Sequence, residues 1–355
     1  MLKKPYLIFL LSCLLHLGIL GQEIEIIKDP KPNCFEKNYY SLKEVGRLKD
    51  VIDKNTILGE ASDVTADNQG NIYVFDRRQS CIFKFDQHLK FIKKFGHSGQ
   101  GPGDFSTPRG LPVLLNIIGE NRLYARDCGN KRVTLFSLDG EYISDYKTEL
   151  SMPFLPVVSE KGERYMPSTR GGVLDVFDGN MKLIDILLDK KEFRRFLFYE
   201  PPPRFKQRYS VPNPDNMSFD LTKGGSLLVY ISNSSSVYVI DKGKWVKKFD
   251  LWPEQVLKEY KPGLNEAIRE SMPDDEAYLV IAGSFFLDRD QEEFFYVNFP
   301  RADSLGMDTL YKFNTGGRLV KVLYVKRGGD YTNFKCKRNG LFYAVRGGIL
   351  VLYRE

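Results

Sequence analysis

The same short pattern recurs along this chain, and this repetition constrains its fold more than any other feature. The stretch "NIYVFDRRQSCIFKF" covers residues 71–85, and "RLYARDCGNKRVTLF" covers residues 122–136. The two align without a gap, so that Tyr73 matches Tyr124. Each copy is an apolar run, a polar turn and an alternating run that ends in an aromatic residue. Internal repetition of this kind indicates a repeat architecture, in which each unit buries its apolar faces against its neighbours.

Further copies follow and bring the total to six. They are "RYMPSTRGGVLDVFDGNMKLI", "SLLVYISNSSSVYVIDKGKWV", "FFYVNFPRADSLGMDTLYKFNTGGRLV" and "LFYAVRGGILVLY". Another strand-like run precedes each copy and one follows most of them, which predicts four antiparallel strands per unit. The 30 glycines and 18 prolines suit strands that are joined by tight turns. We therefore predict an all-β fold, a six-bladed β-propeller of four-stranded antiparallel blades.

The last unit lacks a fourth strand before the sequence stops at Glu355. We expect an N-terminal segment, either "EIEII" or "YYSLKEV", to supply that strand and to close the ring, because closure removes exposed sheet edges. The propeller is predicted to span residues 22–355. A short helical insertion is expected between the fourth and fifth blades, in residues 252–277, where apolar residues recur at helical spacing.

Two stretches also resemble a known family of repeats. "YARDCGNKRVTLFSLDGEYI" is similar to the NHL repeat, with its aromatic residue, Asp, small residues, Asn, Arg-Val pair, second aromatic residue and Asp-Gly. "GHSGQGPGDFSTPRGL", residues 96–111, resembles the Gly-rich connector before the next NHL blade. Ser168 and Ile231 replace the Asp in the third and fourth units. The resemblance implies a six-bladed NHL-type propeller of the kind found in exported bacterial proteins, and it implies no single activity.

The first 21 residues have the pattern of a secretory signal peptide. Lys3 and Lys4 precede the apolar run "PYLIFLLSCLLHLGIL", which ends at Gly21 before polar sequence. We predict cleavage there and an exported protein, which is periplasmic, on the cell surface or secreted. An uncleaved anchor is the first alternative, but the run is short for a membrane span. Lipid attachment at Cys13 is the second, and apolar rather than polar residues follow it. No later stretch predicts a span of the mature chain.

Four cysteines remain after the predicted cleavage: Cys34, Cys81, Cys128 and Cys336. An oxidising compartment permits disulfides, and four cysteines allow three pairings that the sequence does not distinguish. Small buried thiols are the other interpretation. No CxxC spacing occurs, so a cysteine zinc site is not indicated.

Three long connectors are expected on one face of the ring. In a four-stranded meander, the turn between the second and third strands lies on the same face as the connector between blades. The connectors cover residues 96–110, 189–216 and 252–277. Long excursions in a compact repeat protein are often functional, so we predict the binding surface on this face.

Basic residues are frequent in the turns of the same face. We name these as candidate ligand-binding residues: Arg77, Arg78, Arg109, Lys131, Arg132, Arg170, Arg301 and Arg346. Guanidinium groups suit carboxylate, sulfate or phosphate. The prediction is therefore a binding or scaffold propeller for an anionic polysaccharide, peptide or protein. Solvated or structurally packed arginines are the alternative. The net charge of +6 is too small to indicate nucleic acid, and the export signal argues against it.

An enzyme is the second hypothesis. The mature chain has only His88 and His97, so a metal site with several histidines from different blades is not available. A Ca²⁺ site made of oxygen ligands remains as an alternative, with Glu60, Asp63 and Asp220 as the candidate ligands near first strands. Such a site would suit a lactonase-like hydrolase or lyase. The carboxylates could instead bind turn amides. No G-x-S-x-G motif is present, and no other cofactor is expected.

Overall fold

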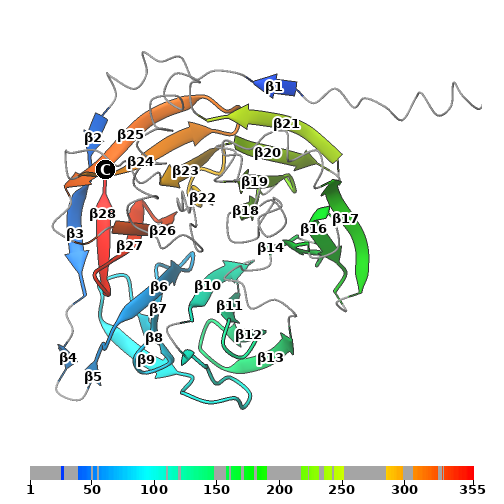
Figure 1. Cartoon of the computed structure of the whole chain (residues 1–355). Coiled ribbons are helices and arrows are strands. Elements are labelled where there is room, and N and C mark those ends of the chain that lie inside the picture. Colours follow the sequence, from blue (N-terminus) through cyan, green and yellow to red (C-terminus); the bar gives the residue numbers. More distant parts are fainter. Residues whose placement is uncertain are drawn as a thin grey trace, which may run out of the picture.

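Six sheets, each built on a four-stranded antiparallel blade, surround a common centre in the computed structural model of this chain (Figure 1). The structure describes residues 25–27, 39–48, 51–53, 56–108, 111–118, 121–147, 157–159, 161–168, 172–179, 182–189, 217–222, 224–231, 236–241, 244–251, 285–298, 307–326, 330 and 332–355. The predicted six-bladed β-propeller is confirmed. Each blade is a meander in which consecutive strands pair antiparallel from the centre outward.

The first three blades follow one another along the chain. Blade 1 contains β6 (Ala61–Ala66), β7 (Ile72–Asp76), β8 (Cys81–Phe85) and β9 (Phe91–Phe95). Blade 2 contains β10 (Val113–Ile118), β11 (Arg122–Asp127), β12 (Arg132–Ser137) and β13 (Tyr142–Lys147). Blade 3 contains β14 (Val157–Val158), β15 (Arg164–Pro167), β16 (Gly172–Phe177) and β17 (Leu183–Asp189).

The last three blades complete the ring. Blade 4 contains β18 (Met217–Leu221), β19 (Leu227–Ile231), β20 (Ser236–Asp241) and β21 (Lys244–Asp250). Blade 5 contains β22 (Phe285–Leu287), β23 (Phe294–Asn298), β24 (Met307–Asn314) and β25 (Leu319–Lys326). Blade 6 contains β26 (Thr332–Arg338), β27 (Leu341–Arg346), β28 (Ile349–Arg354) and the N-terminal β3 (Lys43–Arg47).

The middle strands are covered on both faces, which explains their continuous apolar sequences. Every residue of β7 and of β8 is buried, whereas the outer strand β9 alternates between partly buried and exposed residues. A strand that packs on both faces reads as an unbroken apolar run, and a half-exposed strand alternates. In the described part, each pair of neighbouring blades shares a cluster of buried side chains. The core is therefore a set of contacts between blades.

The N-terminal segment runs along the outer edges of blades 4, 5 and 6 (Figure 1). β3, from "YYSLKEV", pairs antiparallel with β28 and is the fourth strand of blade 6. The other candidate, "EIEII", contains β1 (Glu25–Ile27), which pairs parallel with β21. A further parallel strand, β2 (Tyr39–Ser41), pairs with β25. Blades 4 and 5 thus gain a fifth strand that the repeat pattern does not predict. A two-stranded hairpin of β4 (Val51–Asp53) and β5 (Thr56–Ile57) precedes blade 1.

Three sequence-based expectations fall on parts that the structure does not describe. The predicted signal peptide, residues 1–21, lies outside the described residues, as do residues 190–216 of the second long connector. The predicted helical insertion, residues 252–277, also lies outside them, and the described residues contain no α-helix. No described helix therefore has the length and apolar character that a membrane crossing requires.

Candidate functional site

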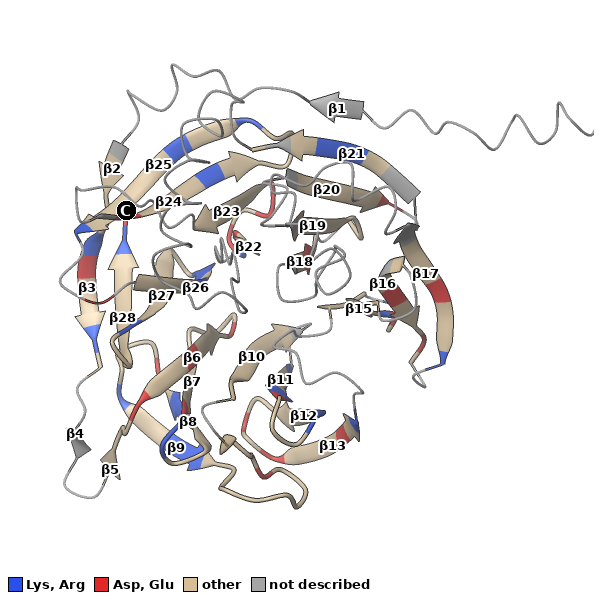
Figure 2. Cartoon of the chain, viewed as in Figure 1, with Lys and Arg blue, Asp and Glu red and all other residues tan. Residues whose placement is uncertain are grey.

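The first strands of all six blades line one cavity at the centre of the ring. Its volume is about 230 Å³, and its lining residues come from β6, β10, β14, β18, β22 and β26. Neighbouring first strands contact one another around most of the ring. Charged segments of both signs lie at this centre, near β18, β22 and β26 (Figure 2). We call this space the central cavity.

The first charged pair in the central cavity joins blade 1 to blade 6. Asp63 Oδ1 on β6 lies 2.9 Å from Lys335 Nζ on β26. Asp63 Oδ2 accepts the backbone N–H of Leu115 on β10 at 2.7 Å. The Asp63 side chain is 6% exposed and the Lys335 side chain 19%. One buried carboxylate therefore contacts both blades that flank its own.

Two strand irregularities position this pair. The register between β6 and β7 shifts between Ala61 and Asp63, which leaves Ser62 as an extra residue. The register between β26 and β27 shifts between Phe334 and Cys336, and the extra residue is Lys335 itself. Such β-bulges locally re-aim a side chain and are frequent next to functional sites. A bulge at Lys335 explains how a lysine on a first strand reaches the central cavity.

The second charged pair joins blade 4 to blade 5. Asp220 Oδ1 on β18 lies 2.5 Å from Arg289 Nη2, just after β22, and also accepts the N–H of Leu221 at 2.9 Å. The backbone N–H of Arg289 donates to the Lys337 carbonyl of blade 6 at 3.2 Å. Going around the ring from blade 1 through blades 6 and 5 to blade 4, the charges are Asp63, Lys335, Arg289 and Asp220. Two cations from neighbouring blades are thus flanked by two carboxylates.

Apolar and small polar residues complete the lining of the central cavity. Phe219, Phe286 and Phe334 line it together with the charged pairs. Phe286 is 5% exposed and Phe334 is fully buried. Small polar side chains, Asn116 and Ser218, lie on the same wall. A concave, partly apolar surface with a few convergent polar groups is the usual character of a small-molecule site.

The structure separates the three predicted metal ligands. Asp63 and Asp220 both line the central cavity, but on blades 1 and 4, and each already pairs with a cation. Glu60 lies elsewhere, where its carboxylate contacts Arg77 and lies 3.5 Å from Arg78. Within the described residues, no group of three or more His, Cys, Asp or Glu could hold a metal ion.

Several of the predicted basic residues are bound within the fold. Arg132 is buried and donates to the carbonyls of Gln100, Gly101 and Asp104, at 3.1, 2.6 and 2.7 Å. It therefore holds the Gly-rich connector against blade 2. Arg346 Nη2 donates to Glu44 on β3 at 2.9 Å and so ties blade 6 to its N-terminal strand.

The other predicted basic residues divide between exposed positions and undescribed ones. Arg77 pairs with Glu60, while Arg78 and Lys131 are exposed. The remaining three lie outside the described residues: Arg109, Arg170 and Arg301. The basic turns that the structure describes therefore do not form a continuous free surface.

Sequence inspection missed a buried triad that occurs in both blade 1 and blade 5. Tyr73 donates its hydroxyl hydrogen to Asp67 at 3.0 Å, and Lys84 lies opposite Tyr73 on the next strand. Burial and the neighbouring Asp67 carboxylate raise the pKa of Tyr73. The signal was present in the repeat, as an Asp after the first strand, a Tyr in the second and a Lys in the third.

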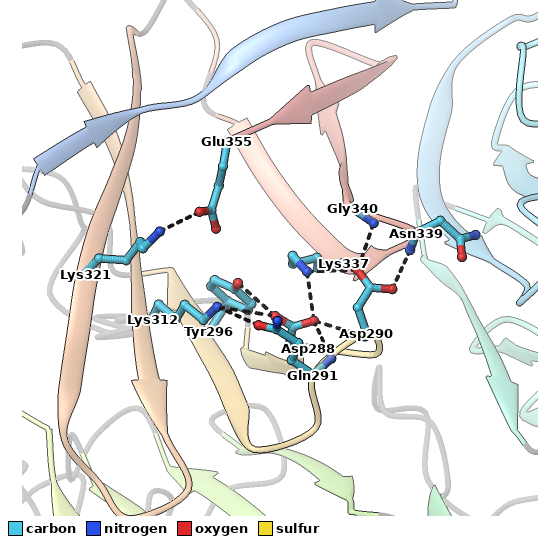
Figure 3. Close-up of polar contacts among 10 residues, drawn as sticks. All are labelled: Asp288, Asp290, Gln291, Tyr296, Lys312, Lys321, Lys337, Asn339, Gly340 and Glu355. Atoms are coloured by element: carbon cyan, nitrogen blue, oxygen red, sulfur yellow. Dashed lines mark hydrogen bonds and ion pairs between the residues drawn. The ribbon is translucent and has the colours of Figure 1, made fainter.

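The blade 5 triad extends into a network that holds blades 5 and 6 together (Figure 3). Tyr296 donates to Asp288 at 3.1 Å, and Lys312 lies opposite Tyr296 on β24. Asp288 also pairs with Lys337 of blade 6 at 2.9 Å. Burial lowers the pKa of Lys312, and Asp288 opposes this effect. The Lys312 ammonium lies 4.1 Å from the ring centre of Phe294.

Asp290 fastens the turn of blade 6 in the same network (Figure 3). Its carboxylate accepts the N–H groups of Asn339 and Gly340, at 2.6 and 2.8 Å, and pairs with Lys337 at 2.9 Å. Burial raises the pKa of Asp290, but the bonds from Lys337 and the two N–H groups outweigh it, so the pKa lies below its ordinary value. The network occupies turns between first and second strands, on the face opposite the predicted basic turns. We therefore treat it as structural.

No disulfide joins the described cysteines to one another. Burial raises the pKa of Cys81 and of Cys336 to about 12, and that of Cys128 to about 11. A thiol of this kind is poorly nucleophilic at neutral pH. Cys34 lies outside the described residues.

Comparison with known proteins supports the fold. The family model DUF5128, described as a 6-bladed beta-propeller, matches residues 51–191. No curated protein sequence matches the chain.

Solved structures with low sequence identity share the propeller architecture. A member of the duf4221 family from Bacteroides vulgatus has 12% identity and a TM-score of 0.54, over 88% of this chain and 97% of that one. A Bacteroides fragilis protein whose description proposes export has 13% identity and a TM-score of 0.53, over 93% and 98%. A catalytically inactive virginiamycin B lyase from Staphylococcus aureus with quinupristin has 8% identity and a TM-score of 0.50, over 87% and 98%. At these identities the likeness concerns the fold alone.

Proposed function

We propose that this protein is an exported binding propeller that takes a ligand with a carboxylate group into its central cavity. The observation that supports this most strongly is the presence of two cations, Arg289 and Lys335, from neighbouring blades in one cavity lined by all six blades. An arginine fork matches the geometry of a carboxylate and also that of a phosphate. The ligand class that we propose is a carboxylate-bearing molecule.

The scaffold suits such a role because Asp63, Lys335 and Asp220 lie on first strands and Arg289 directly follows one. Rigid elements hold binding groups in place before the ligand arrives, which reduces the entropy lost on binding. The partly buried position of these charges also strengthens a charge–charge contact relative to the same contact in water. The basic turns are a weaker candidate for the binding site, because Arg132 and Arg346 already donate hydrogen bonds to groups of the protein itself.

Export belongs to the same proposal. It rests on the signal-like residues 1–21 and agrees with the NHL-type repeats of blades 1 and 2, whose resemblance points to exported bacterial proteins. The lyase alternative has weaker support. It requires carboxylates that converge on a divalent ion, whereas Asp63 and Asp220 each pair with their own cation.

A thermal-shift screen with carboxylates and their uncharged amides tests the proposal. We expect one or more carboxylates, and not the matching amides, to raise the melting temperature of the purified protein. The variants Arg289→Met and Lys335→Met should lose this shift. Lys326→Met is the matched control, because it removes one charge from an exposed position at the end of β25. A shift that survives in both cavity variants would overturn the proposal, as would a panel in which no carboxylate acts.

A further inference from the structure

The geometry points to a zwitterionic ligand, an amino acid or very short peptide with an apolar side chain, as the molecule that the central cavity binds. This inference rests on the proposed function and specifies its ligand. The observation that motivates it is the balance of charge in the cavity. Lys335 and Arg289 contribute two positive charges, and Asp63 and Asp220 contribute two negative ones.

A simple anion fits this balanced site poorly. To reach Lys335 or Arg289 it must compete with Asp63 or Asp220, and it adds a net negative charge to a partly buried space. Buried charges are tolerated when they are paired. A zwitterion meets this condition, because its carboxylate binds the cations while its ammonium group compensates the carboxylate that it displaces. The site then remains neutral when it is occupied.

The two cations differ in how they can respond to a ligand. Among the described contacts Arg289 uses Nη2 for Asp220, and a guanidinium carries five N–H donors in a planar fork. It can therefore hold a ligand carboxylate while it keeps Asp220. Lys335 sits on a bulge and has a flexible stem. Its ammonium can turn from Asp63 toward the ligand, which frees the Asp63 carboxylate for the ligand ammonium.

The apolar part of the lining and the size of the cavity select the rest of the ligand. Leu114 and Phe219 are only partly buried and offer an apolar surface beside the charges. The volume of about 230 Å³ lies below the roughly 300–1,000 Å³ of sites for drug-sized molecules. One amino acid with an aromatic or large aliphatic side chain matches this space, whereas a folded partner does not.

Isothermal titration with three related probes tests the inference. The probes are L-phenylalanine, N-acetyl-L-phenylalanine and L-phenylalaninamide, which differ only in their charged groups. We expect phenylalanine to bind at least about tenfold more tightly than either blocked form, the factor that corresponds to about 1.4 kcal/mol. If the N-acetyl form bound as tightly as phenylalanine, the inference of a zwitterionic ligand would be wrong, but the proposed binding of a carboxylate would remain. If none of the three binds and no other carboxylate shifts the melting temperature, both proposals fall.

The variant Asp63→Asn gives a result of opposite sign for the two probes. It should weaken phenylalanine about tenfold, because the ligand ammonium loses its partner. The same change should not weaken N-acetyl-phenylalanine and is expected to strengthen it, because Lys335 becomes free of its ion pair with Asp63. Asn keeps an oxygen that can accept the Leu115 N–H, so folding is preserved, and melting curves check this. Glu141→Gln, at an exposed turn position, is the control. Parallel weakening of both probes would overturn the inference.

Discussion

Asp63 of blade 1 accepts the backbone N–H of Leu115 of blade 2 at 2.7 Å, so a side chain of the central cavity also bonds two blades together. Its other carboxylate oxygen pairs with Lys335 of blade 6. Blade 1 is the point where the ring begins and blade 6 the point where it closes. Asp63 is thus part of the candidate binding site and also joins blade 1 to blades 2 and 6. A binding experiment on an Asp63 variant therefore needs a measurement of its stability as a control.

Replacement of Asp63 by Ala should lower the free energy of unfolding by about 2–4 kcal/mol. The change leaves the Leu115 N–H and the Lys335 ammonium without their buried partner. Urea unfolding at pH 7 measures the effect. Asp63→Asn should cost less, because it keeps an acceptor, and the exposed Glu141→Gln should stay within about 0.5 kcal/mol of the parent. A loss below about 0.5 kcal/mol for Asp63→Ala would show that the carboxylate does not hold the blades.

Gly317 contributes to the packing of blade 5 on blade 4. It has a φ of 82°, and a Cβ there would lie 2.3 Å from a ring carbon of Phe249. Gly225 has a similar φ of 81°, with open space around its absent Cβ. Both Ala variants should lose about 1–2 kcal/mol from the left-handed backbone, and Gly317→Ala a further 1–3 kcal/mol, roughly, from overpacking. Chemical denaturation measures both, and equal losses would refute the contact.

The N-terminal strands can be tested by two truncations. A chain that begins at Tyr39 lacks β1 but keeps β3, whereas a chain that begins at Leu48 also lacks β2 and β3. The second should lose at least about 3 kcal/mol relative to the first, because the β28 edge and the buried Leu42 lose their contacts. Calorimetry and binding of a hydrophobic dye follow the change. Identical melting of the two chains would mean that β3 does not close the ring.

The lowered pKa of Asp290 predicts how the free energy of unfolding depends on pH. Its pKa lies below the ordinary value in the folded protein, so its contribution is present above about pH 4 and disappears as the pH falls through the folded value. Asp290→Ala should therefore cost about 1 kcal/mol at pH 7, a modest figure because the carboxylate is partly exposed. Urea unfolding at pH 7, 5 and 3 should show the gap to the parent shrinking only at the lowest pH. A gap that is constant with pH would exclude the ion pair as its source.

The repeat alone was sufficient to predict the blades. Tyr73 and Tyr124 align because both occupy second strands, where neighbouring blades cover the two faces of the sheet and apolar residues are required in succession. The repeat pattern was not sufficient to identify the strand that closes the ring. "EIEII" and "YYSLKEV" both alternate, and the pairing of β3 with β28 depends on contacts between the two ends of the chain, which a local pattern cannot rank.

The sequence by itself determined the number of blades and the order of the strands within each repeat, and two of its three candidate carboxylates, Asp63 and Asp220, reach the centre, whereas Glu60 does not. The sequence did so because burial imposes a local pattern on each strand. Only the tertiary structure decided which charges meet. Lys335 and Arg289 join the site through a bulge and a turn, and Arg132 turns inward to bind carbonyls of the connector. These outcomes depend on partners that are distant in sequence, and therefore no local spacing encodes them.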